Sequence, residues 1–192
     1  MVQAWPGWES VAVVLALMYL VLAVCRSIWC WYAAFSSASI YLVIFYTKLL
    51  YMESALQIFY AAMAVYGWWQ WRRGEAGGEL PISRLTWGQH VRLVALIGVG
   101  TVGFGFLMSR TAAALPWLDS FTTVAAVIAT WMVARKILEN WYYWLVIDSV
   151  SIYLYLSRGL MLTAVLFGLY IILIFVGIVA WNRAYRQQTA YA

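Results

Sequence analysis

The sequence contains few charged residues. Only 10 % of its 192 residues are charged, whereas 66 % are hydrophobic. A soluble domain is about 25 % charged and about half apolar, so an ordinary soluble domain is excluded. Uncharged runs as long as 159–182 have the length that an α-helix needs to cross a lipid bilayer. The same runs exclude a β-barrel, because barrel strands alternate polar and apolar residues.

Histidine and cysteine are scarce as well. His90 is the only histidine, which excludes sites that need two or three His ligands, so neither a metal nor a cofactor is expected. Cys25 and Cys30 lie at one helix junction, assigned below to the cytoplasmic side, where thiols stay reduced. No disulfide is therefore expected. The apolar run before Arg26 lacks the basic n-region of a cleavable signal peptide.

The net charge of +5 does not point to nucleic acid as a partner. The twelve Lys and Arg residues occur in ones and twos between apolar runs, instead of gathering on one face as in nucleic-acid-binding proteins. We interpret them as determinants of membrane topology.

Uncharged runs predict an all-α polytopic membrane protein with seven transmembrane helices. Only Asp148 interrupts one of these runs. The predicted spans are 10–25, 27–47, 54–71, 93–109, 120–134, 140–157 and 159–182. The longest connector, 72–92, contains Gly74, Gly77, Gly78 and Pro81 and is predicted to be a loop.

The distribution of Lys and Arg predicts the orientation of the spans. The connectors after spans 1, 3, 5 and 7 hold nine of these residues, and the opposite side holds only Lys48, Arg110 and Arg158. Short cytoplasmic loops collect basic residues, so the N-terminus is predicted to be periplasmic and the C-terminus cytoplasmic.

A parallel internal repeat is predicted from matching segments. Residues 37–42 match 149–154 at an offset of 112, which also pairs Trp29 with Trp141 and Ser36 with Asp148. Later matches, such as Tyr60 with Tyr170, have an offset of 110. Spans 1 and 5 show no convincing identity. The predicted organisation is a first three-helix repeat (1–73), a loop, linker helix and outer loop (74–119), a second three-helix repeat (120–183) and a tail (184–192).

Such a 3+1+3 arrangement, in which the two repeats run parallel, is that of the SWEET-type transporters. It favours a transporter over a receptor or an enzyme. The spans contain no Ser/Lys pair or paired carboxylates, so no catalytic residues are assigned. The lack of a nucleotide-hydrolysing motif excludes ATP-driven transport by this chain alone.

Polar and aromatic residues at helical spacing are the candidate lining of a transport path. Asp148 is the strongest, because a carboxylate near the bilayer midplane is costly unless it faces protein, water or a ligand. Gln57 and Asn140 add amide groups, although Gln57 also suits a helix-to-helix tie and Asn140 a helix N-cap. Helix packing is the alternative for each stripe. The candidate substrate-binding residues are Gln57, Tyr60, Trp68, Asn140, Trp144, Asp148, Ser151 and Tyr170.

Three segments resemble the bacterial PnuC nicotinamide riboside transporters. They are Leu56–Gln57 with 66–71, the string 135–144 (Arg-Lys-Ile-Leu-Glu-Asn-Trp-Tyr-Tyr-Trp), and Trp117–Ser120. The resemblance implies uptake of nicotinamide riboside, an NAD precursor, across the inner membrane by facilitated diffusion. It also implies trapping by a cytoplasmic nicotinamide riboside kinase.

Two alternatives stay open at this level. The fold is shared with transporters of thiamine and other vitamins, so the substrate depends on the neighbourhoods of Gln57 and Glu139–Trp141. The second alternative is that the chain is the substrate-binding subunit of an ATP-driven vitamin importer. The sequence leaves the oligomeric state open, a homo-oligomer included.

Overall fold

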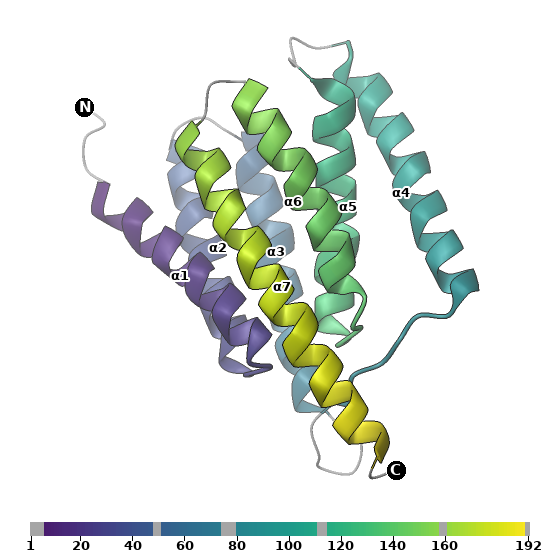
Figure 1. Cartoon of the computed structure of the whole chain (residues 1–192). Helices are drawn as coiled ribbons and strands as arrows, with labels where there is room; N and C mark the ends of the chain where they lie inside the picture. Colours follow the sequence, from purple (N-terminus) through teal and green to yellow (C-terminus); the bar gives the residue numbers. More distant parts are fainter. Residues whose placement is uncertain (1–5, 48–50, 74–79, 111–114, 158–160, 191–192) are drawn as a thin grey trace. The chain divides into compact units, whose positions relative to one another are not determined.

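The computed structural model describes residues 6–47, 51–73, 80–110, 115–157 and 161–190. These residues form seven α-helices, as predicted, and they divide into two compact units, 1–81 and 82–192 (Figure 1). Lys48, Arg158 and the glycines at 74, 77 and 78 lie outside the described residues. The helices are α1 (Pro6–Val24), α2 (Trp29–Thr47), α3 (Tyr51–Arg72), α4 (Trp87–Met108), α5 (Pro116–Ala134), α6 (Asn140–Ser157) and α7 (Met161–Ala190).

The surfaces of the helices are apolar, as a membrane environment requires. Among the described residues, α1, α4, α5 and α7 are long and apolar enough to cross a bilayer, and α2 is a shorter apolar helix. Val14 is 62 % exposed and Val99 is 72 % exposed. Exposed apolar surface of this extent is unfavourable in water and normal against lipid. The chain is a multi-pass membrane protein.

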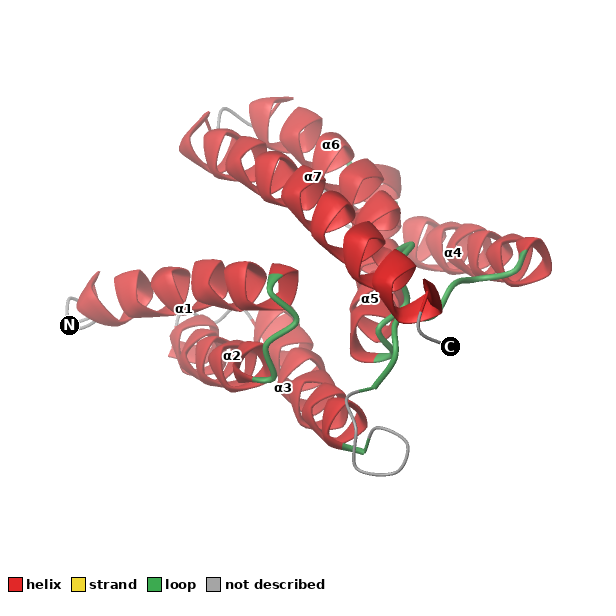
Figure 2. Ribbon diagram, turned by 60° about the horizontal axis from the view of Figure 1, so that its bottom comes forward, coloured by secondary structure: helices red, strands yellow, loops and turns green. Residues whose placement is uncertain are grey.

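In unit 1, α2 packs against both α1 and α3 (Figure 2). The hydroxyl of Ser37 donates a hydrogen bond to the carbonyl of Ala12 at 2.9 Å, which ties α2 to α1. The indole of Trp31 lies against Gly67 of α3, where a Cβ would come within 2.3 Å of the ring. Trp31 also meets Trp71 edge to face, with ring centroids 5.4 Å apart. A glycine at position 67 is therefore needed for the close approach of α2 and α3.

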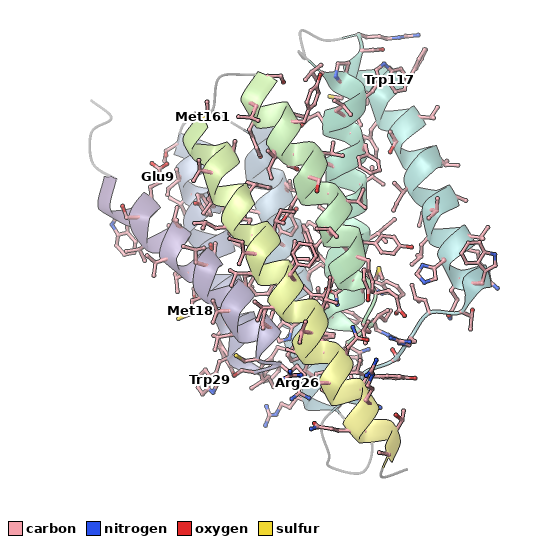
Figure 3. The ribbon with its side chains drawn as sticks, in the orientation of Figure 1. Glu9, Met18, Arg26, Trp29, Trp117 and Met161 are labelled. Atoms are coloured by element: carbon pink, nitrogen blue, oxygen red, sulfur yellow. The ribbon has the colours of Figure 1, made fainter. Side chains whose placement is uncertain are left out.

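In unit 2, the same contact is made by different residues. Trp141 of α6 lies against Gly177 of α7, and its ring centroid is 5.6 Å from that of Trp181 in an edge-to-face arrangement. Helix α4 packs on α5, where Trp117 fills the space beside Gly105 (Figure 3). A cluster of buried apolar side chains from α4, α5 and α6 forms the core of this unit.

The bounds of α1, α2 and α3 recur in α5, α6 and α7 at an offset of about 110. Helices α1 and α5 begin at Pro6 and Pro116 and end at Val24 and Ala134, and the gap from 47 to 51 recurs from 157 to 161. Trp31 is 2 % exposed and Trp141 is 1 % exposed, whereas Trp29 is 64 % exposed. The predicted offset of 112 for α2 and α6 is therefore wrong, because it pairs an exposed tryptophan with a buried one.

The corrected offset reveals identities that the sequence comparison missed. In α1 and α5, Pro6, Ser10, Val14 and Ala16 match Pro116, Ser120, Val124 and Ala126. The position that corresponds to Asp148 is Ala38 and not Ser36. Ala38 and Asp148 are each 4 % exposed. Burial of this position is thus compatible with a methyl group, so the carboxylate of Asp148 is not needed for packing of the repeat.

The α1–α2 junction and the α5–α6 junction contain the same turn. Arg26 has φ = 58° and Lys136 has φ = 48°, the left-handed conformation that usually belongs to glycine after a helix. The N–H of Ser27 donates to the carbonyl of Leu22, and that of Ile137 to Met132, both at 2.9 Å. These hydrogen bonds satisfy carbonyls that the helix end leaves without partners.

Candidate functional site

The candidate residues of unit 1 lie on α3. Gln57, Tyr60 and Trp68 are half-buried. In the described part of the chain, Gln57 has no hydrogen-bond partner for its carboxamide. The ring of Trp68 lies 6.4 Å from that of Tyr32, and the guanidinium of Arg72 sits 5.0 Å above it. Gln57 therefore offers one donor group and one acceptor oxygen on a helix rich in aromatic rings.

Gln57 and Tyr60 share one face of α3, at spacings of three and four residues, with Ala64, Gly67 and Trp71, and we call these five residues the α3 stripe. Ala64, Gly67 and Trp71 are buried. Gly67 and Trp71 contact Trp31 of α2. Helix packing, the alternative weighed for this stripe, accounts for these three positions. Within the α3 stripe, Gln57 and Tyr60 are the partly exposed members.

The start of α6 carries Asn140 in a fully buried position. Its side-chain amide donates to the carbonyl of Ile137 at 2.6 Å. The side-chain oxygen of Asn140 and the indole N–H of Trp141 are buried without a partner among the described residues. Asn140 thus stabilises the α5–α6 turn with one end of its amide and presents an unused acceptor with the other. Buried polar atoms without partners are uncommon and frequently mark functional sites.

Asp148 lies two turns further along α6, with Ser151 one turn beyond it. Both side chains are buried, at 4 % and 7 % exposure. Within the described residues, the Asp148 carboxylate has neither a hydrogen bond nor an ion pair. An unpaired carboxylate is costly in a membrane helix. This position therefore favours a polar ligand or water as the missing partner.

Trp144 and Tyr170 lie on α6 and α7. Trp144 packs against the buried cluster that contains Ile128, Met132 and Ile147, so at least part of its surface belongs to the core of unit 2. Tyr170 is half-buried, and its ring centroid is 5.3 Å from that of Phe167, which in turn is 5.0 Å from Tyr155. These three rings form a small aromatic cluster between α6 and α7.

Sequence reasoning missed the pair of buried tryptophans at the starts of α2 and α6. The indole N–H groups of Trp31 and Trp141 are both buried and unpaired among the described residues. Trp141 had been paired with Trp29, so Trp31 was not considered. Gly67 and Gly177, which lie 110 residues apart, are the signal in the sequence, because each leaves room for a large ring opposite it.

The chain is similar in sequence to known transporters. Residues 7–183 match the family model described as nicotinamide mononucleotide transporter. The riboflavin/roseoflavin transporter RibM of Streptomyces davaonensis is 30 % identical over 186 residues, which cover 94 % of this chain and 87 % of that protein. The nicotinamide riboside transporter PnuC of Escherichia coli is 23 % identical, with coverage of 96 % and 88 %.

A crystal structure of the vitamin B3 transporter PnuC has the same fold. It superposes with a TM-score of 0.74 and 25 % sequence identity, covering 96 % of this chain and 84 % of that one. The fold and the family model together define a membrane transporter and not an enzyme. The chain belongs to the nicotinamide mononucleotide transporter family, as its resemblance to PnuC predicted.

Proposed function

We propose that this chain takes up a flat, ring-bearing vitamin with a hydroxylated sugar group, nicotinamide riboside in the first place, by facilitated diffusion. The observation that carries the proposal is the unpaired, buried Asp148 on a helix that also presents the free acceptor of Asn140. The cationic ring and hydroxyl groups of nicotinamide riboside suit aromatic faces and a few polar groups. A cytoplasmic nicotinamide riboside kinase would trap the substrate.

Each candidate residue is proposed to contact the substrate because of its surroundings within its own unit. The side-chain amide of Gln57 can donate a hydrogen bond to the carboxamide of the substrate and accept one from it. The carboxylate of Asp148 can accept hydrogen bonds from the ribose hydroxyl groups. Tyr60 and Tyr170 supply ring faces. Substrate contact stays a prediction for Trp68, Asn140, Trp144 and Ser151. Packing against the buried cluster accounts for part of the surface of Trp144.

Riboflavin is the second candidate substrate. It is favoured by the likeness to RibM, which extends over 94 % of this chain. Riboflavin also combines a flat ring system with a hydroxylated chain, but its ring is larger and uncharged. Uptake of thiamine and a role as the binding subunit of an ATP-driven importer are the remaining alternatives.

The membrane arrangement is proposed to be two parallel three-helix repeats joined by α4, in the bacterial inner membrane. The constant offset of 110 across three helices supports it. Equivalent positions are separated by four crossings, and an even number of crossings restores the direction of the chain. The proposed domain boundaries are 1–73, 74–119, 120–183 and 184–192, with the N-terminus periplasmic and the C-terminus cytoplasmic.

The native cysteines provide a test of orientation. Cys25 is exposed at the α1–α2 junction, and Cys30 is buried. A membrane-impermeant maleimide applied to intact cells should therefore leave the wild-type protein unlabelled. The Gly7→Cys variant in a Cys25→Ser background should be labelled, because Gly7 is exposed at the opposite end of α1. Labelling of Cys25 from the outside would show that the orientation is reversed.

Uptake into proteoliposomes that contain only this chain tests the function. Radiolabelled nicotinamide riboside should equilibrate across the membrane without ATP, and unlabelled riboflavin and thiamine should compete weakly. An imposed pH difference should not drive accumulation, because the described spans offer a single buried acid. Strong competition by riboflavin would favour the second candidate, whereas a strict requirement for a separate ATPase would favour the importer subunit.

A further inference from the structure

A short extended segment, Ile82–Leu85, lies across one end of unit 2, and we call it the clasp. Ser83 forms a parallel β-bridge with Ile137 in the α5–α6 turn. The N–H of Ser83 donates to the carbonyl of Lys136 at 3.1 Å, and the N–H of Leu138 donates to the carbonyl of Ser83 at 3.0 Å. The segment that leads to α4 passes beside the C-terminal end of α7 (Figures 1 and 2).

Side chains of the α5–α6 turn and of α7 complete the hydrogen bonding of the clasp. The carboxamide of Gln188 accepts from the N–H of Ile82 at 2.9 Å and donates to its carbonyl at 3.2 Å. The carboxylate of Glu139 accepts from the N–H of Leu85 at 3.1 Å. Side chains thus take the place of a second neighbouring strand, which satisfies backbone groups that would otherwise need water.

Arg84 joins the start of α6 to the end of α7. Its guanidinium donates to the side-chain oxygen of Asn182 at 2.9 Å and lies 3.8 Å from the carboxylate of Glu139. The same group sits 4.9 Å above the ring of Tyr185. One side chain therefore contacts both the residue that precedes α6 and helix α7.

Unit 1 has the same turn without a clasp. At the offset of 110, Glu139 and Asn182 correspond to Trp29 and Arg72, neither of which has a side-chain oxygen to accept these bonds. In the part of the chain that the structure describes, Ser83 with Ile137 is the one isolated bridge. The turn after α1 forms with the same hydrogen bonds as the turn after α5. The clasp is therefore not needed to form such a turn.

We propose that the clasp keeps the α5–α6 turn, the start of α6 and the end of α7 in one rigid piece throughout the transport cycle. In this proposal, Arg84, Glu139 and Gln188 are positioning residues for translocation and do not contact the substrate. The inference rests on the transport function. Glu139 directly precedes Asn140 and Trp141, so the clasp fixes the orientation of the buried polar start of α6. Helices that move as rigid bodies transmit a conformational change, and a loosened end slows it.

The first test separates translocation from binding. Gln188→Leu removes both bonds to Ile82 from an exposed position, and Gln187→Leu is the matched control at the neighbouring exposed position. The maximal rate of nicotinamide riboside uptake should fall about threefold or more in Gln188→Leu, which corresponds to the loss of a typical hydrogen bond. The dissociation constant, measured by calorimetry, should stay at the wild-type value. Glu139→Ala should act in the same direction.

Two outcomes would overturn the proposal: a wild-type uptake rate in both Gln188→Leu and Glu139→Ala, or a weakened affinity that accounts for the loss of rate. If the wild-type protein carries riboflavin and not nicotinamide riboside, riboflavin is the probe. Failure of the wild-type protein to carry either compound would count against the proposed function, and the crosslink described next would then test the clasp by the rate of thiol reaction alone.

The second test asks whether the clasp stays closed. A disulfide in Ser83→Cys/Ile137→Cys is compatible with the spacing of bridged residues, and a Cys25→Ser background removes the exposed native thiol. The two introduced thiols should crosslink rapidly, and uptake should be the same in the oxidised and the reduced protein. Arrest of uptake by oxidation would show that the clasp opens during transport, and slow crosslinking would show that it is already open; either result contradicts the proposal.

Discussion

Asp148→Ala should weaken the binding of nicotinamide riboside about tenfold or more and leave the protein folded. The carboxylate is 4 % exposed and has no partner among the described residues, and the corresponding residue of unit 1 is an alanine of equal burial. Loss of a hydrogen bond to a buried ligand group costs about 1 to 3 kcal/mol, and about 1.4 kcal/mol is a factor of ten in affinity. Calorimetry on purified protein gives the dissociation constant.

Two further substitutions sharpen this test. Asp148→Asn keeps hydrogen bonding and loses the charge, so it should retain much of the affinity if Asp148 reads hydroxyl groups. If it reads the charge of the pyridinium ring, Asn should behave like Ala. Ser149→Ala is the control on the same helix, because its hydroxyl is exposed and its one hydrogen bond within the described residues goes to the carbonyl of Leu145.

Gln57→Ala should also weaken binding, because it removes the carboxamide that is proposed to pair with that of the substrate. Wild-type affinity in both Asp148→Ala and Gln57→Ala would show that neither side chain contacts the substrate.

Gly67→Ala should destabilise unit 1 by about 1 to 3 kcal/mol, the typical cost of inserting a methyl group into a well-packed contact. The new Cβ would lie 2.3 Å from the ring of Trp31, which is itself confined by Trp71. The ring and the helices must therefore move apart. A lower midpoint of thermal unfolding in detergent measures the effect.

Gly168→Ala is the matched control, because nothing lies within 4 Å of a Cβ at that helical position. It should be neutral or slightly stabilising, since alanine favours helices over glycine. Trp31→Leu combined with Gly67→Ala should recover part of the loss by making room for the methyl group. Equal stability of Gly67→Ala and Gly168→Ala would contradict the proposed contact.

The seven helices could be predicted because bilayer-spanning segments must be long and uncharged, and the sequence shows this directly. The register of the repeat could not. The match at an offset of 112, five of six residues, occurs in two helices that are both rich in serine and tyrosine. The true equivalence involves Arg26 with Lys136 and Cys30 with Asn140, pairs that share a backbone conformation or a degree of burial but not a residue type.

The candidate site was predictable only in part, for a physical reason. Asp148 and Asn140 are polar residues at positions that lipid cannot satisfy, and both are buried in protein. The stripe on α3 has helical spacing, but a helix uses the same spacing to pack on a neighbour and to line a path. Which half of the stripe packs depends on Trp31, and the sequence alone did not identify that tryptophan as the partner.

The constant offset between the two units implies that chain length is under tighter constraint than residue identity. One residue inserted in α3 between Gly67 and Trp71 would turn one of them about 100° away from Trp31, because each residue advances a helix by that angle. Substitutions in the same helix change one contact, whereas an insertion misaligns every later one. The two sets of three helices thus differ in composition, whereas the spacing of their helices along the chain is kept.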